Sequence, residues 1–155
     1  ESKLRANGCP TCVVINSGSS GSTSAGAKKR LEWQLRGSKP EILILALGAN
    51  DGLRGVEVKA TKDNLEQVIV LAKSKDIKVL LAGMLVPPNY GKQYSREFSE
   101  IFPELAKKHQ VALIPFLLEG VAGNPKLNLA DGIHPNADGY KIVAENVATE
   151  LRKLL

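Results

Sequence analysis

The chain lacks any long hydrophobic run, and this absence excludes one class of protein. No apolar stretch in its 155 residues approaches the roughly 20 residues that an α-helix needs to cross a bilayer. We therefore expect no membrane span. Low-complexity tracts are also absent, and the hydrophobic fraction of 43% is typical of a globular protein. We interpret residues 1–155 as a single domain, large enough to bury a core.

Aromatic residues are scarce, at 5% of the chain, and this bears on the net charge of +5. Proteins that bind nucleic acids usually gather their basic residues on one face, often interleaved with aromatic rings. Here the basic residues are scattered and interleaved with Glu and Asp, in segments such as Lys28-Lys29-Arg30, Lys107-Lys108 and Arg152-Lys153. We interpret them as solvated surface and expect no nucleic-acid partner.

Only two cysteines are present, in the sequence Cys9-Pro10-Thr11-Cys12. A thioredoxin-like redox pair would open a helix after a strand. This pair instead precedes the apolar run 13–15 and leads into a predicted strand, so a local disulfide in an oxidising compartment and two free thiols are the alternatives. The chain begins at Glu1 rather than Met, so we expect residues upstream, and the lack of a signal peptide is no argument for a cytoplasmic location.

Short apolar runs alternate with helical patterns along the whole chain. Runs that are apolar nearly throughout predict parallel strands with both faces covered, and they lie at residues 12–16, 41–47, 78–83 and 111–115. Apolar residues at helical spacing predict helices at 27–37, 61–75, 95–109 and 136–155, with Thr61 as a cap of the second. This order predicts an α/β fold, a parallel sheet inside a three-layer α/β/α domain.

Three polar segments follow predicted strands or precede the last helix, and in such folds the chemistry gathers at the carboxyl ends of the strands. Asp131 and His134 have the spacing at which a carboxylate holds one imidazole nitrogen and leaves the other free to take a proton. Alternatively, the two residues cap the helix that follows. Asn50, in Gly48-Ala49-Asn50-Asp51, is a candidate oxyanion donor, although the same string is also typical of a structural turn.

The Ser/Gly-rich loop at residues 16–23 is open to three interpretations. Its enzymatic interpretation uses the backbone N–H of Gly21, where the missing side chain lets a substrate approach closely. It could equally be a flexible connection. A phosphate cradle is the third alternative, but the loop lacks the Lys of a nucleotide-binding loop, which also disfavours nucleotide binding by the fold as a whole.

Taken together, these segments resemble the blocks of the SGNH (GDSL) hydrolase family, and most closely its bacterial thioesterase I / lysophospholipase (arylesterase) type. The resemblance covers nearly the whole chain, in order. Its motifs are residues 14–23, Gly48-Ala49-Asn50-Asp51 with the following Gly52-Leu53-Arg54-Gly55, residues 87–91, residues 101–105, and Asp131 with His134. The resemblance implies a flavodoxin-like α/β/α fold and a periplasmic or secreted location.

The resemblance also implies an activity. It predicts a serine esterase or thioesterase that hydrolyses small acyl esters or thioesters through an acyl-enzyme, with no metal and no cofactor. His134 would be the general base and Asp131 its orienting carboxylate, while Gly21 and Asn50 would form the oxyanion hole. The alternative is a catalytically inactive binding module that has kept the cleft and lost the nucleophile.

Two departures from the family pattern bear on that activity. Ser22 stands where the family usually has Asp. More seriously, the family's Gly-Asp-Ser-Leu block, with the nucleophile, has no counterpart here, and no Asp-Ser pair occurs in the chain. Ser20 and Ser22, beside Gly21, are weak substitutes. The usual first strand, which would lie between residues 12–16 and 41–47, is missing with that block, so we expect its place to be filled. An associated N-terminal peptide, a segment numbered differently, a swapped homodimer and a sheet that closes over the gap are the alternatives.

Overall fold

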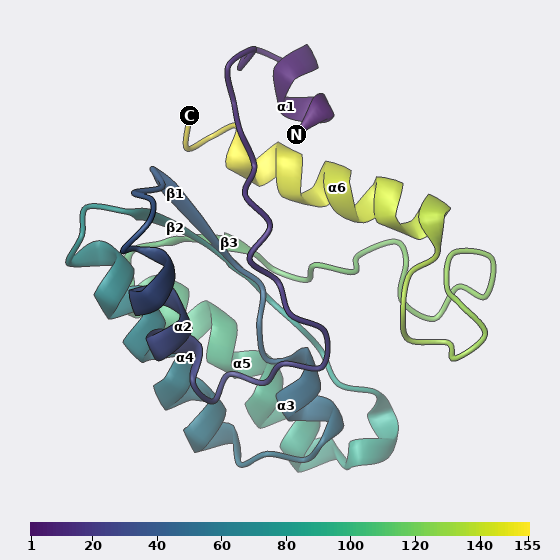
Figure 1. The fold of residues 1–155 in the computed structure, drawn as a ribbon. Coiled ribbons are helices and arrows are strands. Elements are labelled where there is room, and N and C mark those ends of the chain that lie inside the picture. Colours follow the sequence, from purple (N-terminus) through teal and green to yellow (C-terminus); the bar gives the residue numbers. More distant parts are fainter. The chain divides into compact units, whose positions relative to one another are not determined.

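The computed structural model describes residues 1–155, apart from the side chain of Pro88. The chain forms two compact units, one of residues 19–115 and the other of residues 1–18 together with 116–155. Figure 1 follows the chain through its helices and strands. None of the helices described is both long enough and apolar enough to cross a bilayer.

The unit of residues 19–115 is built on a parallel sheet of three strands. β1 (Ile42–Leu45), β2 (Lys78–Ala82) and β3 (Ala112–Ile114) lie in that order and pair in parallel, with Leu43 beside Val79 and Leu81 beside Leu113. β2, the middle strand, is buried from Val79 to Ala82. Three of the predicted strands are therefore confirmed, each shorter than its apolar run.

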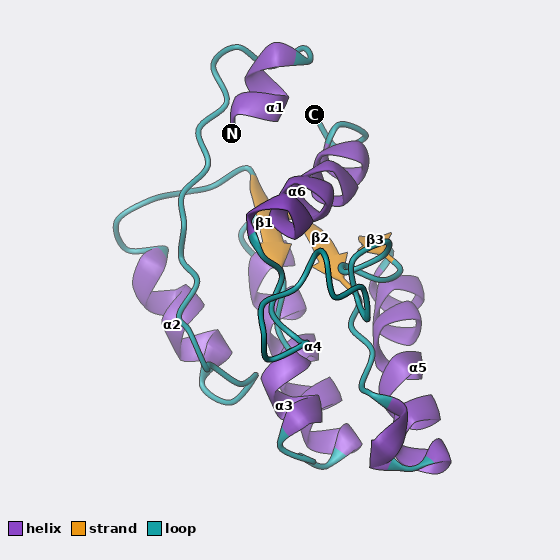
Figure 2. Ribbon diagram, turned by 90° about the vertical axis from the view of Figure 1, so that its right-hand side faces the viewer, coloured by secondary structure: helices purple, strands orange, loops and turns teal.

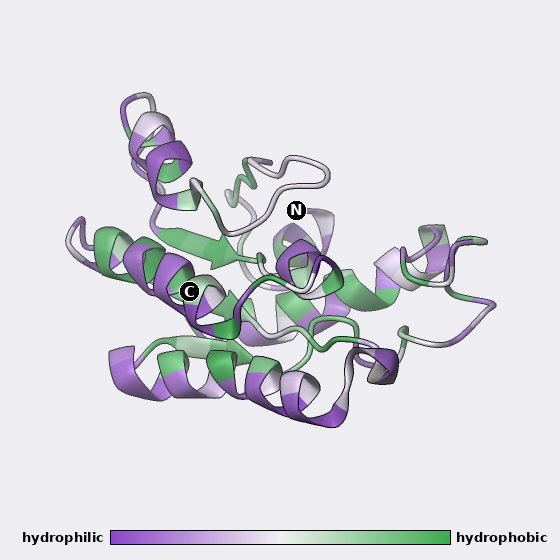
Figure 3. Ribbon diagram, turned by 90° about the horizontal axis from the view of Figure 1, so that it is seen from below, coloured by the Kyte–Doolittle hydropathy of each residue, from purple (hydrophilic) through white to green (hydrophobic). Residues whose placement is uncertain are grey.

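Helices cover this sheet through their apolar faces. α4 (Val58–Lys73) and α5 (Lys92–His109) lie side by side, both in contact with β2, and α2 (Ala27–Gln34) packs against α4 (Figure 2). Two short elements complete the unit, α3 (Ala49–Leu53) and the 3₁₀ turn η1 (Pro88–Tyr90). The strands are largely green in Figure 3, while the helices carry both green and purple, as amphipathic helices do. Buried apolar side chains recur on these helices at the spacing that predicted them, at Leu31, Leu65, Val68, Ile69, Ala72, Phe98, Ile101 and Leu105.

The predicted cap of the second long helix is wrong. α4 begins at Val58, with Glu57 at the N-cap position, and Thr61 lies one turn inside the helix. Its side chain is fully buried and donates a hydrogen bond to a carboxylate oxygen of Asp51. A threonine before an apolar run fits the sequence pattern of a helix cap. The same pattern also arises when the hydroxyl makes a buried polar contact from inside the helix.

The predicted strand at residues 12–16 is also wrong. Residues 13–19 have no regular secondary structure, and the side chains of Val13 and Ile15 are 71% and 63% exposed. A strand needs a neighbour to accept and donate its backbone hydrogen bonds, and this segment has no such neighbour among the residues described. In the part of the chain that the structure describes, β1 is likewise paired on one edge only, with β2.

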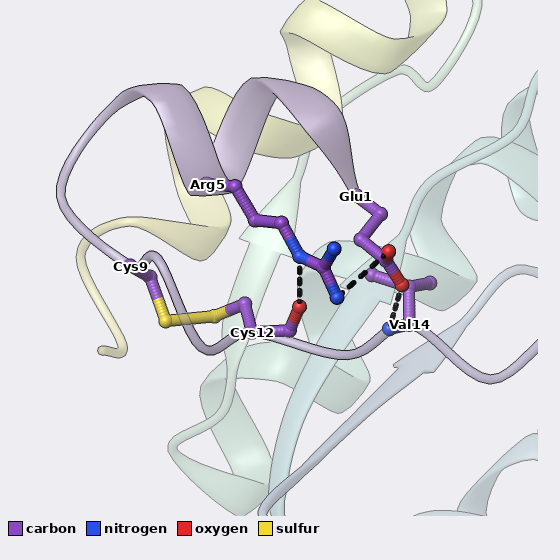
Figure 4. Close-up of a disulfide and its surroundings, with 5 residues drawn as sticks. All are labelled: Glu1, Arg5, Cys9, Cys12 and Val14. Atoms are coloured by element: carbon purple, nitrogen blue, oxygen red, sulfur yellow. Dashed lines mark hydrogen bonds and ion pairs between the residues drawn. A yellow bond between two sulfur atoms is a disulfide. The ribbon is translucent and has the colours of Figure 1, made fainter.

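A disulfide between Cys9 and Cys12 closes the turn after α1 (Ser2–Ala6), which settles the choice left open by the sequence. The side chain of Arg5 reaches this turn and donates to the carbonyl of Cys12 at 2.9 Å (Figure 4). The carboxylate of Glu1 pairs with Arg5 and accepts a hydrogen bond from the N–H of Val14. The helix, the disulfide turn and the first extended residues are thus one connected piece of structure.

In the same unit, α1 packs against α6 (Ala137–Leu151), the last helix. Lys3 and Glu145 form an ion pair between them at 2.7 Å. The small core of the unit consists of apolar side chains that are at most 5% exposed: Leu4, Val121, Ala148 and Leu151. Tyr140 lies on the same helix but is 57% exposed, outside this core.

Candidate active site

The Gly48-Ala49-Asn50-Asp51 segment forms the start of α3, which corrects its interpretation as a simple turn. Gly48 precedes the helix with a φ of 110°, a left-handed conformation that favours glycine. A Cβ on Gly52 would lie 2.3 Å from the side chain of Val86, and one on Gly48 would lie 3.2 Å from the ring of Phe102. The two glycines therefore let α3 sit directly on the side chains beneath it, which fixes the position of Asn50.

The side-chain amide of Asn50 is held by the Ser/Gly-rich loop. Its Nδ2 donates to the carbonyl of Ser22 at 3.0 Å. Because an amide nitrogen carries two hydrogens, this bond leaves one N–H available to a further acceptor. Arg54, at the end of α3, donates to the carbonyl of Gly21 at 3.0 Å. The structure thus brings together the two predicted oxyanion donors, Gly21 and Asn50, within the unit of residues 19–115.

The two serines proposed as weak substitutes for a nucleophile lie in this loop. The hydroxyl of Ser22 accepts a hydrogen bond from Arg30 at 3.0 Å, and Ser20 is exposed. A serine nucleophile needs a base as its hydrogen-bond partner, and among the described contacts neither hydroxyl has one.

Behind the loop lies a buried polar cluster that the sequence did not reveal. The carboxylate of Asp51 is fully buried and accepts hydrogen bonds from the backbone N–H of Ser24 at 2.8 Å, from the Ser24 hydroxyl, and from Thr61 at 3.4 Å. Asn64 in turn donates to the Ser24 hydroxyl at 3.1 Å. Asp51 was missed because an acidic residue in a glycine-rich string resembles a solvent-exposed turn. The available signal was its position directly beside Asn50.

The second group of predicted residues lies in the other unit. Asp131 and His134 form a compact turn in which Oδ2 of Asp131 lies 2.8 Å from Nδ1 of His134, and Oδ1 accepts the backbone N–H groups of Ile133 and His134 at 3.0 Å each. With Nδ1 protonated towards the carboxylate, Nε2 is left as a proton acceptor. The imidazole is 61% exposed.

The capping alternative for this pair is wrong, because Asn136 is the N-cap of α6. Its side-chain oxygen accepts the N–H groups of Asp138 and Gly139 at 3.0 Å each. The loop before it is fixed by Asn128, whose Nδ2 donates to the carbonyls of Val121 and Asn124, both at 2.7 Å. Asp131 is therefore free of any role in the helix, and its contacts hold His134.

These contacts lower the pKa of Asp131 to about 2, first through the backbone N–H of His134, then that of Ile133, then the His134 side chain. Because the pKa of Asp131 in the folded protein lies below its ordinary value of 3.8, the ionised carboxylate stabilises the turn at pH values above about 4. This stabilisation is lost as the pH falls from about 4 to about 2. In an NMR titration of the folded protein, we expect the backbone N–H resonances of Ile133 and His134 to titrate together with a common midpoint near pH 2. A midpoint at the ordinary carboxylate value would contradict the geometry described.

Comparison with known proteins places this arrangement in a family. Residues 1–142 match the model of the GDSL-like lipase/acylhydrolase family. The chain is 43% identical to an arylesterase of Vibrio mimicus over 143 residues, which are 92% of this chain and 72% of that protein. It is 38% identical to the Escherichia coli protein named thioesterase 1/protease 1/lysophospholipase L1 over 142 residues, 92% of this chain and 68% of that protein. A crystal structure of TesA superimposes with a TM-score of 0.93 at 40% identity, covering 99% of this chain and 86% of the other.

The fold and the matched sequence together define an acyl hydrolase of the SGNH type. The chain belongs to the GDSL-like lipase/acylhydrolase family, and it is a carboxylic ester hydrolase of that class. The predicted family and the predicted α/β fold with a parallel sheet are thereby confirmed.

Proposed function

We propose that the protein is a serine esterase or thioesterase that cleaves small acyl esters or thioesters through an acyl-enzyme. The observation that carries the proposal is the Asp131–His134 pair, in which the carboxylate accepts the Nδ1 side of the ring and leaves Nε2 exposed. In this mechanism Nε2 takes the proton of a serine hydroxyl as it attacks the acyl carbon, and then returns it to the leaving oxygen or sulfur.

The oxyanion that forms in this attack needs donors already in place. We assign that role to the second N–H of Asn50 and to the backbone N–H of Gly21, which are fixed by the contacts of Asn50 with Ser22 and of Arg54 with Gly21. Removal of one such donor typically costs about 10²- to 10³-fold in kcat. The names of the relatives, arylesterase and thioesterase among them, support esters and thioesters as the substrate classes.

We further propose that the nucleophilic serine lies on a strand that pairs with β1 and is supplied from outside these 155 residues, within one domain together with them. Two observations support this. β1 has no partner on one edge among the residues described, and residues 13–15 are exposed and belong to none of the described strands. An associated N-terminal segment or a swapped second copy could supply such a strand. The disulfide favours an oxidising compartment, periplasmic or extracellular.

A fluorophosphonate probe tests the proposal, because it bonds covalently only to an activated serine. Full-length protein carrying these residues is expected to be labelled on one serine, and His134→Ala is expected to abolish the labelling. Mass spectrometry of the labelled peptide then locates the nucleophile. Absence of labelling in protein that circular dichroism shows to be folded would favour the rival function, a binding module without catalysis.

A further inference from the structure

α3 is tied to the Ser/Gly-rich loop by side chains on two successive residues. Asn50 donates to the carbonyl of Ser22, and Asp51 accepts the backbone N–H of Ser24, at 3.0 and 2.8 Å. One hydrogen bond goes to Ser22, inside the loop, and the other comes from Ser24, directly after the loop. In the first the side chain on α3 is the donor, and in the second it is the acceptor. A displacement of Ser24 relative to α3 therefore also displaces Ser22, the residue that orients the Asn50 amide.

The environment of Asp51 makes its tie the firmer one. The carboxylate is fully buried and Ser24 is 1% exposed, whereas Asn50 and Ser22 are half-buried. Both oxygens of Asp51 accept from Ser24, one from the N–H and one from the hydroxyl. A hydrogen bond to a buried carboxylate is costly to break, because the carboxylate oxygen is then left without a partner and away from water.

The cluster also connects the loop to α4. Thr61 donates to the same oxygen of Asp51 that accepts the Ser24 hydroxyl, and Asn64, one turn further along α4, donates to that hydroxyl. α4 packs against the sheet and is apolar and buried on that face. The loop that carries Gly21 is in this way anchored to a helix that packs on the sheet.

From this geometry we propose that Asp51 is a positioning residue of the hydrolase, which sets the Ser22–Ser24 backbone and thereby the direction of the Asn50 amide in the oxyanion hole. This inference rests on the proposed function. Asp51 does not touch the substrate. It affects the rate by positioning Asn50 and the loop. A substitution of Asp51 should therefore lower the rate much less once the Asn50 side chain has been removed.

The test is a double-mutant cycle between Asp51→Asn and Asn50→Ala, with p-nitrophenyl acetate as substrate. Asp51→Asn keeps the shape of the side chain but replaces an acceptor oxygen by a donor. It is expected to lower kcat about 10- to 100-fold, since misplacement by about 1 Å can cost 10²-fold, with KM changed less than about threefold. In the Asn50→Ala background the same substitution is expected to lower kcat less than about threefold, because the group it positions is gone.

His109→Gln is the control. It removes a partly buried contact between α5 and α4 that lies outside the Asp51 cluster, so the midpoint of urea unfolding falls while kcat stays within about twofold. An equal loss of kcat from Asp51→Asn in both backgrounds, or from His109→Gln, would overturn the proposal. If Asp51→Asn does not fold, Ser24→Ala takes its place in the cycle, with an expected loss of about 3- to 10-fold that again vanishes with Asn50→Ala. A parent rate unaffected by Asn50→Ala contradicts the oxyanion-hole assignment instead, so the two failures are distinguishable.

Discussion

His134→Ala is expected to reduce kcat for p-nitrophenyl acetate by about 10³- to 10⁴-fold in full-length protein, with little change in KM. A positioned general base contributes about 10²- to 10⁴-fold, and the upper range applies because one imidazole takes the proton in acylation and delivers it to the leaving group. Among the described contacts, Asp131 is the residue that holds the ring, which is 61% exposed, so its removal disturbs no packed core. The unfolding midpoint is therefore expected to stay close to that of the parent.

His109→Gln is the control for this prediction, because His109 is the other histidine of the chain. It is largely buried, and its Nε2 lies 2.7 Å from a carboxylate oxygen of Glu66. This contact links α5 to α4, and its loss is expected to lower the stability while leaving kcat within about twofold. Similar losses of kcat in both histidine variants would show that general destabilisation, rather than loss of a base, is responsible.

Asn50→Ala is expected to lower kcat by about 10²- to 10³-fold, the usual effect of losing one oxyanion-hole donor. KM should change little, because the donor acts on the charge that develops in the transition state rather than on the bound ester. Asn50→Asp should be at least as damaging, since it replaces the donor by an oxygen that repels the oxyanion. Steady-state kinetics of the three proteins under one condition measures the effect.

Arg54→Ala separates the loss of the donor from a loosening of the loop. Arg54 donates to the carbonyl of Gly21 from an exposed position, so its removal frees the loop without removing either proposed donor. A reduction of kcat of less than about tenfold is expected. If Arg54→Ala were as slow as Asn50→Ala, the rate would depend on the order of the loop and the direct role of the amide would be contradicted.

The elements of this fold that could be predicted from the sequence are those that depend on local pattern. Leu65, Val68, Ile69 and Ala72 repeat at helical spacing, and all are buried in α4. Val13–Ile15 carries an equally clear strand pattern but forms no strand. Strand formation depends on a partner, which no pattern within the segment reports.

The same distinction between local pattern and tertiary contacts applies to the residues of the candidate site. Asp131 and His134 were predictable because their contact is local, over three residues, and their hydrogen bond is present. The proximity of Gly21 and Asn50 was predictable from the order of their motifs along the chain, because both follow predicted strands of one sheet. Asp51 could not be assigned, because its partners Ser24 and Thr61 lie 27 and 10 residues away along the chain, and the cluster exists only once Ser24, α3 and α4 have come together. Burial, which decides whether a polar residue is structural or solvated, is a tertiary property.

The proposed function requires that the imidazole of His134 and the amide of Asn50 act on the same acyl carbon. The most direct test of this requirement is a crystal structure of the full-length protein after reaction with diethyl p-nitrophenyl phosphate, which leaves a tetrahedral phosphoryl group on the nucleophile. We expect one phosphoryl oxygen about 2.7–3.1 Å from Nδ2 of Asn50 and from the N–H of Gly21, with Nε2 of His134 within hydrogen-bond reach of the serine oxygen. A phosphoryl group bonded to a serine that faces neither His134 nor Asn50 would contradict it.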